Sequence, residues 1–303
     1  MSQTTVIIPT YNRPHLIGRA VKSVLNQTYQ NFEIVIIDSS PDRKTEEVVK
    51  AFSDKKIRYF HNMEKTGPSA ARNQGIKFAD PSSQYIAFLD DDDEYLPQFL
   101  EKTVDFLDKN KDVKMVTSNM ELRARNGKFI RKTHAKSPWW EQGISRGCVI
   151  WKDIFIKENF WYDERLEIME DPDLGLRILR NHKWECLSDV LFIYYVYPLT
   201  GETTLCSVPS VKSVDIFYDK NYRVFKDSGR KALGFFYFRN GKIFLRSGEF
   251  KKGRENILKA FITYPNLIYL LHYALTFMEL LLPGFSQNVS LRILKQKIFR
   301  GKI

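Results

Sequence analysis

The sequence predicts an α/β fold in which helices flank a mostly parallel sheet, followed by a helical C-terminal appendage. Over the first 120 residues, short apolar runs alternate with helical patterns. Strands that alternate with helices indicate βαβ units and therefore parallel strands. The expected strands cover residues 5–8, 32–37, 57–60 and 85–89. From about residue 232 the pattern becomes helical, which predicts the appendage.

The helices between these strands have recognisable starts. Pro14 and Pro68 suit the first turn of a helix, where a proline removes no required hydrogen bond. After Pro14, apolar residues recur at helical spacing: Leu16, Ile17, Ala20, Val21, Val24 and Leu25. Ligands of parallel sheets bind at the carboxyl ends of the strands. We therefore expect the functional site among loops 9–13, 38–42 and 90–94.

Composition favours a folded protein of a reducing compartment. The chain has 303 residues, 43% of them apolar, which is enough for a large domain with an appendage. Its three cysteines, Cys148, Cys186 and Cys206, are scattered and fit neither a disulfide framework nor a zinc site. The chain enters an apolar strand without the basic and long apolar regions of a signal peptide. We therefore expect a cytoplasmic protein.

Five consecutive acids, Asp90–Glu94, follow the expected strand 85–89 directly. Adjacent carboxylates repel one another, and a helix start would favour only one or two of them. A divalent cation accounts for the rest, because hard oxygen ligands suit Mg²⁺ and Mn²⁺. The alternative is a solvated acidic loop, which the position at the carboxyl end of a strand disfavours.

Four segments in order resemble the family 2 glycosyltransferases, which are inverting enzymes with the Rossmann-like GT-A fold. The resemblance covers about residues 4–200. It is carried by the opening strand and loop Val6–Arg13, the G-x-S-x-A-R-N segment Gly67–Asn73, the D-x-D segment Phe88–Asp93 with Pro97, and the ED segment Glu170–Asp171 with Asp173, Leu174 and Arg177.

The resemblance implies a site for a nucleotide-diphosphate sugar. The residues that it assigns to the base and ribose are Pro9, Thr10, Tyr11, Arg13 and Asp38. Asp38 would accept a hydrogen bond from a uracil N–H, which favours a UDP-sugar, and Arg72 would face the donor or its diphosphate. Asp90 and Asp92 would bind Mn²⁺ or Mg²⁺, with Asp92 the favoured ligand, while Asp91 would contact ribose or sugar.

Asp171 is the general base that the resemblance implies, with Glu170 orienting it. Inverting transfer needs a carboxylate that takes the acceptor proton while the nucleotide leaves from the opposite face. The metal and Arg72 would stabilise charge on the departing diphosphate. Structural alternatives remain open: Asp171 could cap a helix before Pro172, and Asp38 could cap a turn. Likewise, Tyr11 could be a core aromatic and Arg72 a surface charge.

Two other functions use a similar set of residues. A nucleotidyltransferase shares the sheet and the acids, but it would need a Gly-rich basic phosphate loop, which 9–13 is not. A catalytically weak sugar-nucleotide-binding scaffold would not need both the acidic run and the ED pair. For the acceptor, a glycan or a lipid-linked sugar, the tryptophans Trp139, Trp140 and Trp161 would offer stacking surfaces, although each is equally typical of a core.

Charge separates the last third of the chain from the rest. Residues 1–200 contain 29 basic and 29 acidic residues, whereas residues 201–303 contain 18 basic and 7 acidic residues. We expect a catalytic domain at 1–205, a helical extension at 206–264 and a membrane-associating segment at 265–303. Glycine, leucine, alanine and proline spacings within 236–266 resemble one tetratricopeptide repeat, a helix pair.

The segment 265–303 has the composition of an interfacial membrane anchor. An apolar run at 267–282 contains His272 and Glu279, which disfavour a spanning helix, and five basic residues follow it. We expect peripheral attachment to an anionic membrane at the cytoplasmic face. Packing of this run on protein is the alternative. Because the basic residues lie beside an apolar run, a nucleic-acid partner is not expected.

Overall fold

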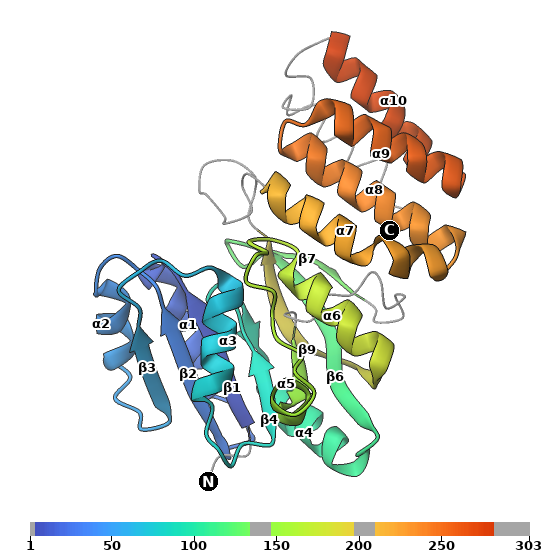
Figure 1. Cartoon of the computed structure of the whole chain (residues 1–303). Coiled ribbons are helices and arrows are strands. Elements are labelled where there is room, and N and C mark those ends of the chain that lie inside the picture. The colour runs from blue at the N-terminus through green and yellow to red at the C-terminus, as the bar shows by residue number, and fades with distance from the viewer. Residues whose placement is uncertain (1–3, 134–146, 197–209, 282–303) are drawn as a thin grey trace. The chain divides into compact units, whose positions relative to one another are not determined.

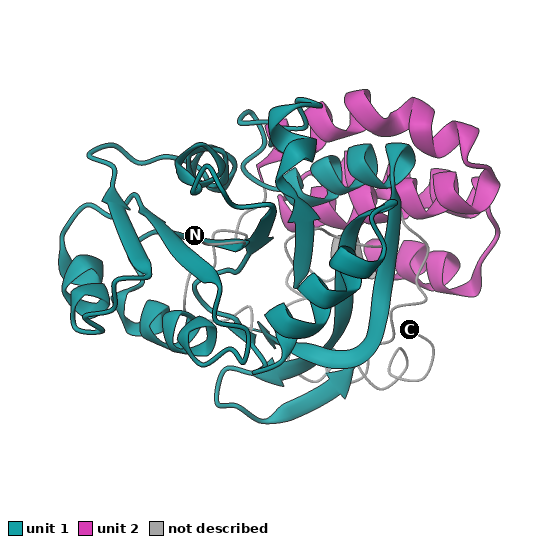
Figure 2. Cartoon of the chain, turned by 90° about the horizontal axis from the view of Figure 1, so that it is seen from below, with its two compact units in different colours: residues 1–207 teal, residues 208–303 magenta. Residues whose placement is uncertain are grey.

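The computed structural model describes residues 4–133, 147–196 and 210–281. The chain divides into two compact units, Met1–Ser207 (unit 1) and Val208–Ile303 (unit 2). Figure 1 labels the helices and strands, and Figure 2 colours the two units. The Trp139–Trp140 pair and the basic tail that follows residue 286 lie outside the described residues.

Unit 1 is built on one sheet whose parallel part contains the four strands expected from the sequence. The order is β3-β2-β1-β4, with bounds Ile57–His61, Phe32–Asp38, Thr4–Thr10 and Tyr85–Phe88. In the parallel register Thr10 lies opposite Asp38, and Asp38 lies opposite His61. The carboxyl ends of β1, β2 and β3 therefore lie level at one edge.

The second half of the sheet is mixed. It continues β4-β8-β6-β9-β5, with β7 paired to β6. These strands are β5 Glu94–Tyr95, β6 Val113–Ala124, β7 Phe129–Lys132, β8 Cys148–Trp151 and β9 Lys183–Val196. Antiparallel pairs join β8 to β4 and β6, whereas β6 and β9 run parallel. The α/β class is confirmed. The antiparallel pairs with β4 and β6 are made by β8, which lies beyond the regular alternation of the first 120 residues.

Helices cover both faces of this sheet. One face is covered by α1 Pro14–Leu25, α2 Lys44–Lys50 and α4 Phe99–Lys109. The other carries α3 Pro68–Phe78, α5 Lys152–Ile156 and α6 Glu170–Asn181. A Cβ on Gly75 of α3 would lie 2.4 Å from Ile7 Cγ2. Because glycine has no Cβ, α3 approaches β1 closely there.

Unit 2 consists of α7 Val211–Asp227, α8 Arg230–Arg246, α9 Phe250–Thr263 and α10 Leu267–Leu281. The helix α7 lies within the expected helical extension 206–264, before the helical pattern that is clear from about residue 232. The helices α8 and α9 form the pair that the repeat-like spacing predicted. They cross closely, since a Cβ on Gly241 would lie 2.7 Å from Ile257 and one on Gly253 would lie 2.6 Å from Leu245.

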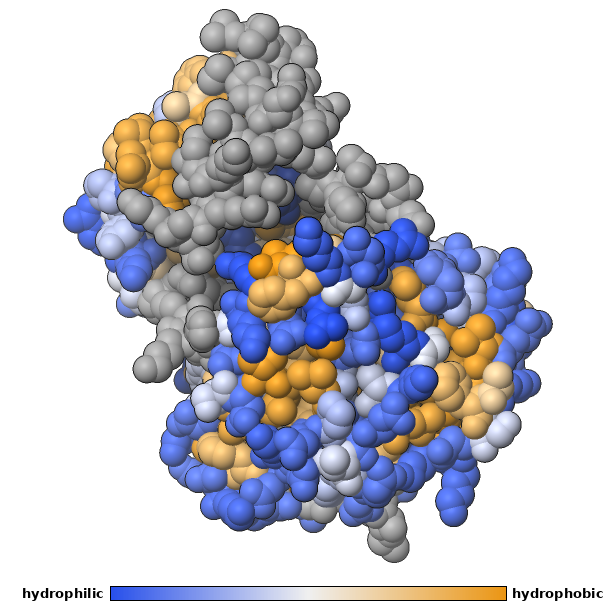
Figure 3. All heavy atoms as spheres, turned by 180° about the vertical axis from the view of Figure 1, so that it is seen from behind, coloured by the Kyte–Doolittle hydropathy of each residue, from blue (hydrophilic) through white to orange (hydrophobic). Residues whose placement is uncertain are grey.

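The apolar helix α10 packs on this pair through part of its surface. Tyr269 is buried, and its ring stacks on Phe238 of α8 with centroids 4.5 Å apart. Other apolar side chains of α10 are exposed: Leu267, Leu270, Leu271 and Phe277. Figure 3 shows hydrophobic surface on unit 2 next to polar surface. Among the described helices, none combines the length and apolar character needed to cross a membrane.

Candidate active site

Three loops meet at the carboxyl edge of the parallel strands, as the sequence predicts. Thr10 donates a hydrogen bond from its hydroxyl to Asp91 at 2.7 Å. The backbone N–H of Ser39 donates to the carbonyl of Thr10 at 3.2 Å. The N–H of Asn12 donates to the Ser40 hydroxyl at 2.7 Å. The loops after β1, β2 and β4 therefore form one connected surface.

The acidic run offers a set of oxygen atoms suited to a divalent cation. Carboxylate oxygens of Asp90, Asp92 and Asp93 all lie within 4.8 Å of one another. Such hard oxygen ligands fit Mg²⁺ or Mn²⁺, which usually keep further positions for water and substrate phosphates. Asp90 and Asp92 were the expected ligands. Asp93 was not among them, although its place in the same acidic run signals it.

Arginines hold this acidic run in place. Arg13 Nη1 lies 2.9 Å from Asp91 Oδ1 and 3.2 Å from Asp92 Oδ2. Arg19 of α1 donates to the carbonyl oxygen of Asp92 at 2.5 Å. The guanidinium of Arg19 also lies 3.7 Å from the centroid of the Tyr195 ring. The sequence did not indicate Arg19, because its contacts are non-local.

The long strand β9 supports the run from the other side. The N–H of Tyr195 donates to Asp93 Oδ1 at 2.9 Å, and its hydroxyl donates to Glu94 at 2.6 Å. Tyr195 lies about a hundred residues from the acids along the chain, so its role was not predictable from local pattern. The acidic run is thus fixed on both sides before any ligand binds.

Burial raises the pKa values of two acids in this run, Asp91 and Asp92. Desolvation, followed by the charges of Asp91 and Asp90, raises the pKa of Asp92 to about 7, while Arg13 opposes the shift. Desolvation also raises the pKa of Asp91, which is lowered again by Arg13 and Thr10. A bound divalent cation would stabilise the ionised forms of these carboxylates, because its positive charge offsets the free-energy cost of burying their negative charge.

Arg72 connects the acidic run to the ED pair. It belongs to α3, and only 3% of its surface is exposed, so it is not a surface charge. Its Nη2 lies 2.7 Å from Asp90 Oδ1, and its Nη1 lies 3.1 Å from Glu170 Oε1 and 3.8 Å from Asp171 Oδ1. Although burial lowers the pKa of Arg72, the charges of Asp171 and Asp90 raise it well above its usual value.

The ED pair forms the first turn of α6. The residue that precedes the helix is Met169, with a left-handed φ of 69°, and no side chain caps the helix. Asp171 is therefore not the helix cap that was its structural alternative. Burial, followed by the charge of Asp171, raises the pKa of Glu170 to about 7, while Arg72 opposes the shift. Two carboxylates thus lie together beside one buried cation.

The residues assigned to the base and ribose lie at the ends of β1 and β2. Asp38 is fully buried and accepts hydrogen bonds from the Ser40 N–H at 2.7 Å, the Ser40 hydroxyl and the Tyr59 hydroxyl at 2.5 Å. These contacts close the turn after β2, as the structural alternative for Asp38 requires. Pro9 and Tyr11 are partly exposed at this edge, and Lys65 Nζ lies 4.7 Å from the Tyr11 ring centroid.

Known proteins assign the chain to a family. The family model described as glycosyl transferase family 2 matches residues 5–164, which are more than half of the chain. The Escherichia coli K12 protein WcaA is 42% identical over 244 residues, covering 75% of this chain and 83% of WcaA. The chain therefore belongs to glycosyl transferase family 2, as its motifs predicted.

Other relatives match a shorter part of the chain. The E. coli UDP-Glc:alpha-D-GlcNAc-diphosphoundecaprenol beta-1,3-glucosyltransferase WfgD is 36% identical over 129 residues, covering 42% of this chain and 50% of WfgD. An uncharacterized glycosyltransferase of Rickettsia felis is 41% identical over 138 residues, covering 44% of this chain and 22% of the relative. The chain thus spans about a fifth of the length of this relative and its Rickettsia conorii counterpart.

Solved structures confirm the GT-A fold. The crystal structure of S. aureus TarS residues 1–349 has a TM-score of 0.64 at 17% identity, covering 88% of this chain and 81% of that one. Its complex with UDP-GlcNAc has a TM-score of 0.60 at 16% identity, covering 91% and 79%. At such identity the similarity concerns the fold.

The raised pKa of Glu170 predicts a pH-dependent stability. The folded protein holds a proton on Glu170 up to about pH 7, whereas the unfolded chain releases it near pH 4.5. The free energy of unfolding should therefore fall as pH rises through this range. In EDTA, Glu170→Gln should be more stable than the wild type by about 3 kcal/mol at pH 8 and nearly equal to it at pH 4.5.

Urea denaturation at pH 4.5, 6 and 8 measures this effect. Glu47→Gln, which replaces an exposed glutamate of α2, is the matched control and should follow the wild type at every pH. If Glu170→Gln shows the same pH dependence as the wild type, Glu170 does not carry the raised pKa.

Proposed function

We propose that this protein is an inverting, divalent-metal-dependent hexosyltransferase. It transfers a sugar from a UDP-sugar to a hydroxyl of a glycan or lipid-linked acceptor. One observation carries the proposal: a carboxylate-rich metal segment and a carboxylate pair meet around one buried arginine at the carboxyl edge of the sheet. The name of WfgD, with a UDP-Glc donor and a diphosphoundecaprenol acceptor, and the UDP-GlcNAc complex of TarS support the substrate classes.

The donor is proposed to bind along the ends of β1 and β2. Base and ribose contact the residues Pro9, Thr10, Tyr11 and Arg13, with Asp91 beside the ribose or sugar, while the buried Asp38 holds the turn that borders them. The contacts of Thr10 and Arg13 with Asp91 preorganise this surface for the nucleotide. Few side chains then have to be ordered when the donor binds. Arg72 lies behind this surface, where its guanidinium contacts Asp90 and Glu170.

Asp90, Asp92 and Asp93 would hold Mn²⁺ or Mg²⁺, which stabilises negative charge on the departing UDP when it is bound. Asp171 takes the proton from the acceptor hydroxyl as that oxygen attacks the anomeric carbon. The bond from the anomeric carbon to the diphosphate breaks on the opposite face, so the configuration inverts. Glu170 orients Asp171 and shares Arg72 with it.

Loss of the metal segment should remove activity without unfolding the protein. Asp92→Ala removes one carboxylate of the proposed metal set, and excess EDTA removes the cation itself. Both treatments should lower transfer by at least about 10²-fold, because diphosphate departure loses its electrostatic stabilisation. Sugar transfer and thermal stability are measured for this variant and for Asp105→Ala, which replaces an exposed acid of α4. Full activity in EDTA contradicts metal dependence.

Replacement of the proposed base should lower the rate of sugar transfer while leaving donor affinity nearly unchanged. Asp171→Asn keeps the shape of the side chain, so donor affinity should stay within about threefold of the wild type while kcat falls by about 10²–10⁴-fold. Calorimetry with UDP and Mn²⁺ measures binding, and UDP release measures turnover. NMR of the product should show an anomeric configuration opposite to that of the donor, and a retained configuration excludes the single-displacement mechanism.

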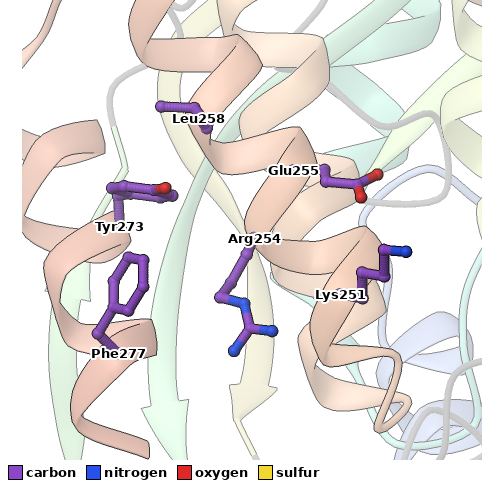
Figure 4. A pocket seen from close by; sticks show the side chains of 6 residues that line it. All are labelled: Lys251, Arg254, Glu255, Leu258, Tyr273 and Phe277. Atoms are coloured by element: carbon purple, nitrogen blue, oxygen red, sulfur yellow. The ribbon is translucent and has the colours of Figure 1, made fainter. Parts of the chain in front are cut away.

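We also propose that unit 2 attaches the enzyme to the cytoplasmic face of an anionic membrane. Between α9 and α10 lies an open groove of ≈ 230 Å³ with cationic and aromatic walls, as Figure 4 shows. Its lining residues are Lys251, Arg254, Glu255, Leu258, Tyr273 and Phe277. The same unit exposes Leu267, Leu270 and Leu271 of α10, and exposed apolar side chains together with basic ones are typical of interfacial attachment.

Flotation with anionic liposomes tests this attachment. Replacing Leu267 and Leu270 of α10 by Asn should lower the floated fraction at least about fivefold, because their apolar area no longer enters the interface. High salt should also lower it. Ile156→Asn, which changes an exposed isoleucine of unit 1, is the matched control. Negligible flotation of the wild type at low salt would contradict membrane attachment.

A further inference from the structure

Side chains on one face of α3 form hydrogen bonds to the segment that leads into the ED pair. Three side chains on this face, Ser69, Arg72 and Asn73, are at most 5% exposed. They stand three and four residues apart, which is the spacing of neighbours on one side of a helix. Buried polar side chains require hydrogen-bond partners, so their contacts define what the helix face does.

All three side chains contact the segment from Tyr162 to Glu170. The Ser69 hydroxyl donates to the carbonyl oxygen of Leu166 at 2.9 Å. The Asn73 side-chain amide donates to the carbonyl oxygen of Tyr162 at 3.0 Å and accepts from the Tyr162 N–H at 3.0 Å. Arg72 lies between these two anchors and donates to Glu170 at 3.1 Å.

Arg72 differs from the other two because it also reaches the metal segment. Its second terminal nitrogen donates to Asp90 at 2.7 Å, so one guanidinium joins two segments that are far apart in the sequence. A guanidinium offers donors in a rigid planar fork, whereas a lysine ammonium is a compact point charge. Among the described residues, Arg72 is the one cation within 4.0 Å of Glu170.

We propose that Arg72 is a positioning residue for the base: it fixes the distance between the metal segment and Asp171 and thereby aligns the proton acceptor with the donor sugar. This inference rests on the proposed function, in which Asp171 is the base. Without the guanidinium, the start of α6 loses its link to the segment that contains Asp90. The base is then no longer held in place, and displacement of a reacting group by about 1 Å costs about 10²-fold in rate.

The experiment compares Arg72→Lys and Arg72→Met with the wild type. Lysine keeps the charge but does not span both partners, so kcat should fall about 10²-fold in Arg72→Lys and further in Arg72→Met. Affinity for UDP with Mn²⁺ should stay within about threefold. The control Arg58→Met removes an arginine of β3 that is paired with Glu33, and its kcat should equal that of the wild type.

Two further measurements distinguish positioning from a general structural role. Hydrogen–deuterium exchange in Arg72→Lys should rise at residues 163–173 and stay unchanged in β2. In addition, the double variant Arg72→Met with Glu170→Gln should lose less activity than the product of the two single losses, because each change breaks the same contact.

Specific outcomes overturn the inference. Wild-type kcat in Arg72→Lys, or a tenfold loss of UDP affinity with unchanged kcat, shows that Arg72 serves the donor rather than the base. Unchanged exchange at residues 163–173 in Arg72→Lys also overturns it, and this measurement needs no turnover. The proposed function has its own test in Asp171→Asn: full activity of that variant refutes the base assignment, whatever Arg72→Lys does.

Discussion

Negative charge crowded at one edge of a sheet is the constraint on which this site depends. Five acids follow β4, and two more begin α6. Arginines from different parts of unit 1 contact them: Arg13 from the first loop, Arg19 from α1 and Arg72 from α3. Because these three cations contact a larger number of carboxylates, an excess of negative charge remains. Such an excess favours a divalent cation, and burial together with neighbouring charge raises the pKa of Asp92 and Glu170.

Local sequence was sufficient to predict the parallel half of the fold and the acidic surface. Each expected strand is a short apolar run, and the carboxyl ends of parallel strands share an edge, so the meeting of loops 9–13, 38–42 and 90–94 was predictable from topology. The mixed half was not predictable in this way. Its strands β8 and β9 pair with partners far away in the sequence, and their aromatic residues suit a core or a strand equally well.

The burial and contacts of individual side chains bear on structural alternatives that the sequence had left open for three charged residues. Arg72 could have been a surface charge, but it lies in the interior between two acidic segments. Asp171 could have capped a helix, but Met169 precedes α6 and no side chain caps it. For Asp38 the structure shows the turn contacts of the structural alternative. The sequence identifies the charged residue in each case, whereas its partners depend on chain segments that only the fold brings near.

The close approach of α3 to β1 at Gly75 has a mechanical consequence for the site. Ile7 fills the space that a side chain on Gly75 would need, and three residues before Gly75 the same helix carries Arg72. Three residues after Ile7, the same strand ends at Thr10, beside Asp91. The proposed nucleotide-binding edge and the arginine beside the carboxylate pair are therefore both positioned by one contact, between the backbone of α3 at Gly75 and the side chain of Ile7. Thermal motion of the surface loops should leave the spacing between them almost unchanged.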